Sequence, residues 1–135
     1  MEGDGATPTG TFPIRYGFYR HDRLKKPFTA IPMQPISEQL GWCDEPNHPC
    51  YNQRVTLPFT ASHERLLRSH SHYDLIVVIG YNDAPVVPGK GSAIFIHIAN
   101  ENYEPTAGCI AFSKTDLIAI LKDMTPQTRI SLWQS

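Results

Sequence analysis

The clearest pattern along the chain is a pair of apolar runs, each of the length of a β-strand. Tyr73–Gly80 contains, after Asp74, a run of leucine and β-branched residues, which is typical of a buried strand. Ser92–Ala99 alternates, as a strand with two different faces does. One face would carry Ile94, Ile96 and Ile98, and the other would carry Ala93, Phe95 and His97.

Shorter patterns predict the other elements. Three further strands are expected at Phe12–Tyr19, Ile110–Phe112 and Thr128–Trp133. A helix should begin after Ser113, because this serine and Asp116 form a signal like a capping box. Its apolar face would consist of Leu117, Ile120, Leu121 and Met124. A second, shorter helix is expected at Ser62–Ser69, with Ser62 as its N-cap.

Between the predicted strands Phe12–Tyr19 and Tyr73–Gly80 lies a long segment with little periodicity. Residues 20–54 are rich in proline, so we expect an irregular excursion over the surface. Long ordered loops in small domains often shape binding sites. With 135 residues, the chain is the size of one domain, which we take as residues 1–135. The fold class expected is therefore mostly β, with one or two short helices.

Charge and hydropathy exclude two classes of function. The net charge is −1, and nucleic-acid binding needs clustered cations, so no nucleic-acid partner is expected. No apolar run approaches the roughly 18–20 residues that a membrane span needs, so no membrane span is expected. The first residues carry no signal peptide. We therefore expect the cytoplasm if Met1 is the natural start, and the periplasm or cell envelope if a signal was removed.

The chemistry that the chain offers is concentrated in residues 97–109. Cys109 follows Gly108, and His97 stands near the end of a predicted strand. A thiol becomes a nucleophile as its thiolate, and a nearby imidazole can take its proton and return it to the leaving group. By itself this pattern is weak evidence for catalysis, because a buried cysteine and a hydrogen-bonded strand histidine would also fit it, so both interpretations stay open on the pattern alone.

Two motifs resemble one known family. The segment from His97 to Thr106-x-Gly108-Cys109-Ile110 resembles the signature of the YkuD-type L,D-transpeptidases, a histidine followed by Ser/Thr-His-Gly-Cys-Ile/Val-Arg. Upstream, Gly3-Asp4-x-x-Thr7-Pro8-x-Gly10-x-Phe12 is similar to the family's Thr-Pro-x-Gly-x-Phe segment. Gly41-Trp42-Cys43-Asp44 and Thr106-Ala107-Gly108-Cys109 are most similar to a compact bacterial subgroup.

The resemblance implies a β-sandwich with the cysteine on the floor of a cleft, acting on peptidoglycan stem peptides. Cys109 would be the nucleophile, and His97 would be the general base and acid. The backbone N–H groups of Gly108 and Cys109 would stabilise the oxyanion. Thr106, Asn82 and Trp42 would contact the substrate. The resemblance implies no metal and no organic cofactor, and it implies that a carbapenem would form a covalent adduct.

Departures from the family pattern keep other functions open. Ala107 stands where histidine is common, and Ala111 where arginine is common. An arginine fork can orient a carboxylate and alanine cannot, so an L,D-carboxypeptidase or amide hydrolase is an alternative. A non-catalytic peptidoglycan-binding domain is another, although it would need no nucleophile. A papain-like protease fits less well, because it expects cysteine before histidine in the chain.

Several further features allow two interpretations each. Trp42 either lines the cleft or anchors the long loop, and Asn82 either binds substrate amides or forms a polar turn. Cys43 and Cys50 are close enough in sequence for a disulfide, with free thiols the alternative. His70 and His72 resemble a metal pair without a third ligand, which favours a surface loop. The family domain usually has a strand before the Gly3-Asp4 segment, and a missing strand would leave a sheet edge able to pair with a second copy.

Overall fold

The structure is a computed structural model of the chain. It describes residues 10–69, 71–83, 86–87, 92, 94–99 and 110–132. Within these ranges strands predominate, with one α-helix and one short 3₁₀-helix, η1 (His72–Asp74). The fold is the mostly β arrangement that the residue pattern predicts.

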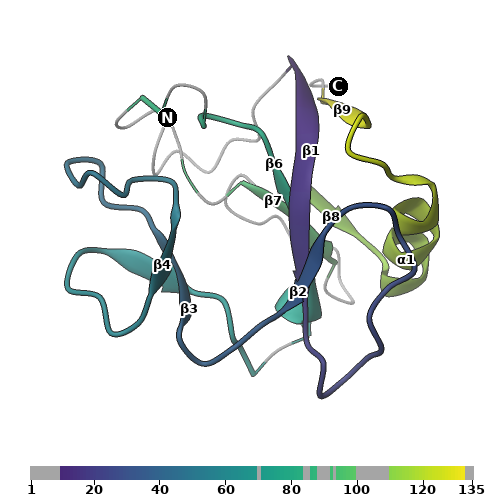
Figure 1. The fold of residues 1–135 in the computed structure, drawn as a ribbon, viewed down its shortest axis with the longest axis horizontal. Coiled ribbons are helices and arrows are strands. Elements are labelled where there is room, and N and C mark those ends of the chain that lie inside the picture. Colours follow the sequence, from purple (N-terminus) through teal and green to yellow (C-terminus); the bar gives the residue numbers. More distant parts are fainter. Residues whose placement is uncertain are drawn as a thin grey trace.

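Among the described residues, the larger of two sheets has six strands. Five of them follow the order β2-β1-β6-β7-β8, and the sixth, β9, also pairs with β1 (Figure 1). Its strands are β1 (Gly10–Tyr19), β2 (Met33–Pro35), β6 (Leu75–Ile79), β7 (Phe95–Ile98), β8 (Ile110–Phe112) and β9 (Arg129–Leu132). Central β6 is apolar throughout, as suits a strand covered on both faces. The five predicted strands are thus confirmed, with bounds shifted by a few residues.

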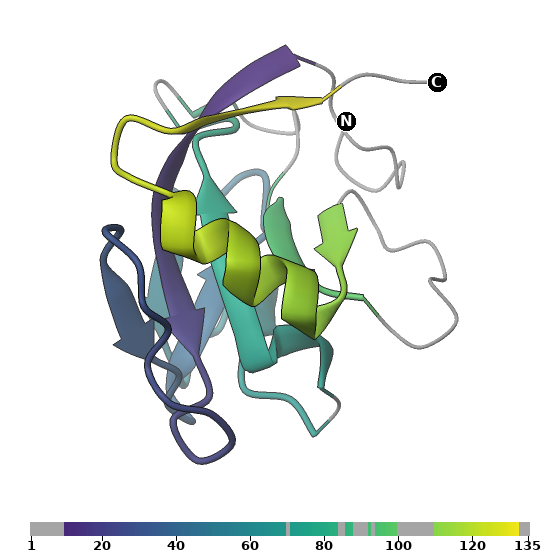
Figure 2. The ribbon, with the colours of Figure 1, turned by 90° about the vertical axis from the view of Figure 1, so that its right-hand side faces the viewer.

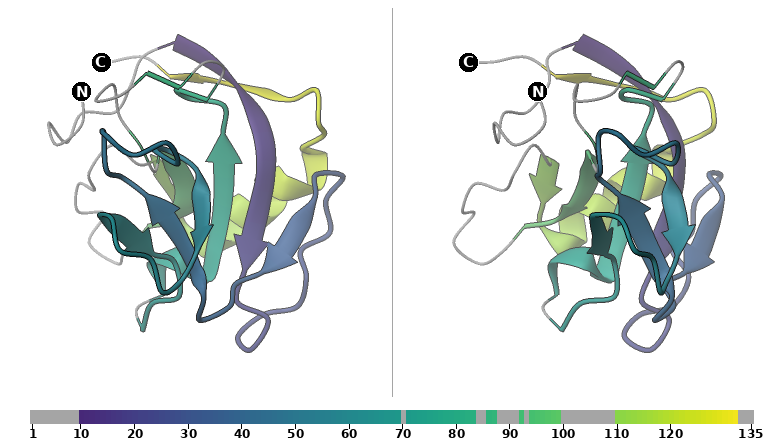
Figure 3. Two further views of the ribbon diagram at one scale, coloured as in Figure 1. Left: turned by 60° about the vertical axis from the view of Figure 1, so that its left-hand side comes forward. Right: turned by 90° about the vertical axis from the view of Figure 1, so that its left-hand side faces the viewer.

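The smaller sheet has three strands in the order β4-β3-β5. They are β3 (Leu40–Cys43), β4 (Arg54–Thr56) and β5 (His63–Arg65). This sheet lies on one side of the large sheet (Figure 3), and α1 (Lys114–Asp123) lies on the other (Figure 2). The large sheet is therefore the middle layer of three.

Each face of the large sheet has its own apolar cluster. On the helix side, Ile96 and Ile98 of β7 pack with Leu117 and Leu121 of α1. On the other side, Phe95 packs with side chains from both sheets, among them Phe18, Leu40, Trp42, Ile76 and Val78. The alternation predicted for Ser92–Ala99 is thus confirmed for residues 95–98, and it puts Phe95 and His97 on the side of the small sheet.

The start of α1 agrees with its sequence signal. The Ser113 side chain accepts a hydrogen bond of 3.1 Å from the backbone N–H of Asp116. Such a cap satisfies one of the N–H groups that a helix leaves unpaired at its beginning. Since every interaction involved is local, this element could be predicted from the sequence.

Two predictions about the middle of the chain are wrong. Ser62–Ser69 is not a helix, because His63–Arg65 forms β5 and pairs with β3 instead. A helix of eight residues is marginal alone, and strand pairing outweighs its propensity. Residues 20–54 are not irregular throughout, since they contain β2, β3 and the first residue of β4.

No helix in the described part of the chain is long and apolar enough to cross a membrane. Edge strand β2 is only three residues long and ends in Pro35, which limits pairing with another chain. Self-association through a sheet edge stays a prediction, as does the single domain at residues 1–135. The Gly3-Asp4 segment lies outside the described residues.

Candidate active site

His97 is the third residue of β7 and is almost fully buried, with 2% of its surface exposed. In the sheet it is paired with Ile76 of β6 on one side and Ala111 of β8 on the other. Paired residues in neighbouring strands project from the same face. The imidazole therefore lies on the small-sheet side, in line with Ala111.

One hydrogen bond defines the tautomer of His97. Its Nδ1 lies 2.8 Å from the backbone carbonyl oxygen of Ile98. A carbonyl oxygen only accepts hydrogen bonds, so Nδ1 carries a hydrogen and donates the hydrogen bond. In the neutral ring, Nε2 then keeps its lone pair. Burial lowers the pKa of His97, the bond to Ile98 opposes that shift, and His72 adds to it. The ring is thus a neutral imidazole with a basic Nε2 at neutral pH.

Aromatic rings hold the imidazole in place. The Tyr73 ring meets it edge to face, with the ring centres 5.5 Å apart, and the His72 ring stacks on it at 6.2 Å. Tyr73 is itself oriented, because its hydroxyl donates a hydrogen bond of 2.8 Å to Glu64. The guanidinium of Arg68 also lies over the Tyr73 ring. Fixed neighbours of this kind restrict the rotation of the His97 side chain.

The predicted nucleophile, Cys109, lies outside the described residues, and so do Thr106, Ala107 and Gly108. The described chain resumes at Ile110, the residue after Cys109, and Ile110 is paired with Ile96 in the parallel ladder between β7 and β8. The strand that follows the cysteine in sequence is therefore the direct neighbour of the strand that carries the histidine.

A family model described as the YkuD L,D-transpeptidase catalytic domain matches residues 1–132. The chain belongs to the YkuD family. Searches of curated proteins and of solved structures found no significant match. The family assignment thus rests on nearly the whole chain, and it agrees with the mostly β architecture and with a histidine strand beside the strand that follows the cysteine.

A cleft of about 430 Å³ opens between the two sheets of this YkuD domain. Trp42 and Tyr81 line it, whereas Tyr51 is buried, with 1% of its surface exposed. The Trp42 ring also packs edge to face on Phe95, with centres 5.1 Å apart. Trp42 therefore both lines the cleft and anchors β3 to the large sheet, so the two interpretations are compatible.

Asn52 joins three segments around the cleft, a role that its sequence context did not indicate. Its Oδ1 accepts a hydrogen bond of 3.0 Å from the Trp42 indole N–H. Its amide nitrogen donates to the carbonyl oxygens of Tyr81 and Asn82, at 3.0 Å and 2.7 Å. Asn52 also has a φ of 58°, a conformation that asparagine tolerates better than most residues. A turn-forming asparagine ten residues after Trp42 was the available signal, but its partners are remote in sequence.

Asn82 is buried, and its side chain closes its own loop. The amide nitrogen donates to the carbonyl oxygen of Val87 at 3.0 Å, and the amide oxygen accepts from the Val87 N–H at 2.7 Å. This arrangement corresponds to the polar turn that the sequence also allowed. Substrate binding by Asn82, Trp42 and Thr106 stays a prediction.

The remaining candidates for chemistry are cysteines and histidines. Cys43 and Cys50 are free thiols, and burial raises the pKa of Cys43. Cys43 is therefore a poor nucleophile at neutral pH. His70 lies outside the described residues. Over the ranges that the structure describes, no group of three or more histidine, cysteine or acidic side chains is arranged to hold a metal ion.

Proposed function

We propose that this YkuD domain is an L,D-transpeptidase, a cysteine acyltransferase of peptidoglycan stem peptides with Cys109 as nucleophile and His97 as base. The observation that carries the proposal is the parallel pairing of Ile96 with Ile110 and of His97 with Ala111. If this register continues by one residue, Cys109 lies opposite Phe95. Because side chains alternate along a strand, the thiol then projects from the face that carries His97.

The state of His97 suits the role of a base. Its Nε2 lone pair takes the proton of the Cys109 thiol, while the bond from Nδ1 to Ile98 keeps the ring oriented. The thiolate attacks the carbonyl carbon between an L-centre and a D-residue, and the backbone N–H groups of Gly108 and Cys109 stabilise the oxyanion. The C–N bond breaks, and Nε2–H protonates the departing D-amino acid.

An acceptor completes the reaction. The amine of a second stem peptide attacks the thioester, its proton passes to Nε2, and the C–S bond breaks to release the cross-linked product. The thiol regains its proton from the imidazolium. In each half of the reaction Nε2 takes up one proton and gives it up again, so His97 and Cys109 return to their starting states, and no metal or organic cofactor takes part in this scheme.

Hydrolysis is the second candidate, and the position of Ala111 favours it. Ala111 is paired with His97, at the place where the family pattern has arginine. Its methyl group offers neither charge nor hydrogen bonds to hold an acceptor in line with the thioester. Water competes wherever that positioning is poor. We therefore expect acyl transfer to be slow and release of the terminal D-alanine to be measurable.

Intact-mass spectrometry tests the proposal. Incubation with a carbapenem should add one covalent mass at Cys109, because the β-lactam carbonyl stands in for the acyl donor. A Cys109→Ser variant is the control and should remain unmodified. With disaccharide-tetrapeptides, the wild-type protein should release D-alanine and form dimers slowly. No adduct on folded wild-type protein would favour the non-catalytic peptidoglycan-binding domain.

A further inference from the structure

The cleft between the two sheets contains more charge than the proposed chemistry uses. It is lined by Tyr16, Trp42 and Val78, by polar side chains of residues 52–54, and by Ile94 just before β7. Two arginines, Arg15 and Arg54, also line it. The cleft therefore runs from β4 across the large sheet to the start of the strand that carries His97.

The charge of Arg15 is already compensated. Its Nε and Nη2 donate to the two carboxylate oxygens of Asp83, at 3.0 Å and 3.2 Å. Gly80 makes room for this pair, because a Cβ there would lie 2.8 Å from the Arg15 Nε. Arg15 and Asp83 thus form a bidentate, nearly neutral unit at one end of the cleft.

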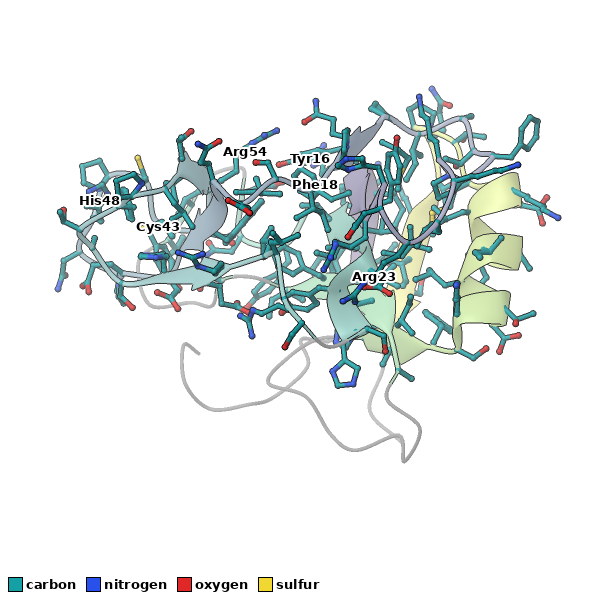
Figure 4. The ribbon with its side chains drawn as sticks, turned by 90° about the horizontal axis from the view of Figure 1, so that it is seen from below. Tyr16, Phe18, Arg23, Cys43, His48 and Arg54 are labelled. Carbon is teal, nitrogen blue, oxygen red and sulfur yellow. The ribbon has the colours of Figure 1, made fainter. Side chains whose placement is uncertain are left out.

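Arg54 is held in a different way. Its Nη1 donates a hydrogen bond of 2.8 Å to the side-chain oxygen of Gln34. Its guanidinium carbon lies 5.3 Å from the centre of the Phe18 ring, a cation–π contact. Figure 4 shows Arg54 beside Tyr16 and Phe18. Within the described residues, no carboxylate is paired with Arg54. The side chain is thus positioned by neutral groups, and its charge faces the cleft uncompensated.

Tyr16 adds a neutral donor next to this charge. Burial raises the pKa of the Tyr16 hydroxyl, Arg54 opposes the shift and Asp83 adds to it. The phenol therefore stays protonated at neutral pH. A guanidinium fork beside a hydroxyl donor is a combination that recognises a carboxylate.

The distance to the reacting centre suits a bound peptide. Tyr16 is paired with Val78, and Val78 is paired with Phe95, which shares the sheet face of His97. Neighbouring strands lie about 4.8 Å apart, so Tyr16 and Phe95 are roughly 10 Å apart along this row. A stem peptide that crosses these strands can therefore extend from the strand of His97 to Tyr16.

We propose that Arg54 binds a carboxylate of the stem peptide and so selects substrates that bear a free acid at a distance from the reacting carbonyl. The inference rests on the proposed function, and it gives this chain a carboxylate-binding arginine although Ala111 replaces the usual one. Arg54 is a specificity-determining residue in this scheme, because it contacts substrate away from the bond that breaks.

The test measures binding separately from turnover. In a Cys109→Ala background, a synthetic tetrapeptide stem with free carboxylates is titrated by calorimetry, alongside analogues in which each carboxylate is amidated in turn. Arg54→Gln should weaken binding of the free-acid peptide about tenfold or more, as expected for loss of a charged hydrogen-bonded pair. Arg54→Lys should restore part of the affinity, since it keeps the charge without the fork.

The controls separate this inference from the proposed function. Arg65→Gln removes the same charge from β5, outside the cleft, and should leave affinity unchanged. One amidated analogue should bind with equal affinity to the Arg54→Gln variant and to the Cys109→Ala parent. The carboxylate that is amidated in this analogue is then the one that Arg54 binds. Equal affinity of parent and Arg54→Gln for the free acid, or no binding to the parent, overturns the inference. Alkylation of Cys109 by uncharged iodoacetamide should not depend on Arg54, so its failure in wild type counts against the proposed function alone.

Discussion

At the scale of single residues, the imidazole of His97 is subject to three influences on its protonation. Burial disfavours the charged ring, the neighbouring His72 does the same, and the carbonyl of Ile98 favours it. Burial is the largest of these, so the pKa lies below the ordinary value of 6.5. His97 is therefore unprotonated, and able to accept a proton, at neutral pH, and it becomes protonated only in more acidic solution.

His97→Asn removes the basic nitrogen but keeps a donor for the hydrogen bond to Ile98. An asparagine amide can donate to the Ile98 carbonyl as Nδ1 does, but it offers no basic nitrogen. We expect alkylation of Cys109 by iodoacetamide near neutral pH to be much slower in the variant, and turnover to fall by about 10²–10⁴-fold. Peptide mapping by mass spectrometry would follow each thiol.

Cys43 and Cys50 provide internal references for this experiment. Neither has an imidazole base in the proposed scheme, so both should react more slowly than Cys109 in wild type. Their rates should not change in His97→Asn. Equal rates for Cys109 in wild type and variant would contradict activation by His97.

At the scale of elements, the cleft depends on contacts between strands that are distant in sequence. Trp42 of β3 packs on Phe95 of β7, and Asn52 ties Trp42 to the loop after β6. Gly41 allows β3 to approach Leu57, because a Cβ there would lie 2.7 Å from the leucine Cδ2. The Gly-Trp-Cys-Asp segment is therefore a packing element whose indole also faces the cleft.

Substitutions at Asn52 should show how much its hydrogen bonds to Trp42, Tyr81 and Asn82 contribute to stability. Asn52→Gly removes the side-chain hydrogen bonds but tolerates the φ of 58°, and we expect it to lower the free energy of unfolding by about 1–3 kcal/mol. Asn52→Ala removes the same bonds and adds a left-handed Cβ, which costs about 1–2 kcal/mol more. Urea unfolding followed by Trp fluorescence would give both values. Equal stability of the two variants would contradict the backbone part of this account.

At the scale of the whole molecule, the stability of the fold should depend on pH through His97. The ordinary pKa of 6.5 applies to the unfolded chain, and the folded value is lower. Below pH 6.5 the unfolded state binds more protons than the folded state, so the free energy of unfolding falls as pH falls. The decline is at most about 1.4 kcal/mol per pH unit for one group, and it ends once the folded pKa is passed.

Thermal unfolding of wild type and His97→Asn between about pH 7.5 and pH 5 checks this dependence. The wild-type melting temperature should fall more steeply with acidification than that of the variant, which lacks the titrating ring. Parallel curves for the two proteins would contradict the assignment to His97.

Local sequence patterns determined much of this protein. Alternation in Ser92–Ala99 placed Phe95 and His97 on one face and the isoleucines on the other, because side-chain direction along a strand depends only on neighbouring residues. The N-cap of α1 was predictable for the same reason, since Ser113 and Asp116 are three residues apart. The histidine and cysteine motifs likewise pointed to the family that the match to residues 1–132 shows.

Tertiary structure decided what local patterns could not. His63–Arg65 became a strand because β3 was available to pair with it, and propensity alone favoured a helix. The cleft brings Arg54 and Asn52 beside Tyr16 and Tyr81, which lie 27 to 38 positions away in the sequence. No window of sequence contains both sides of such a contact. The charge that faces the cleft therefore emerges only when the two sheets pack together.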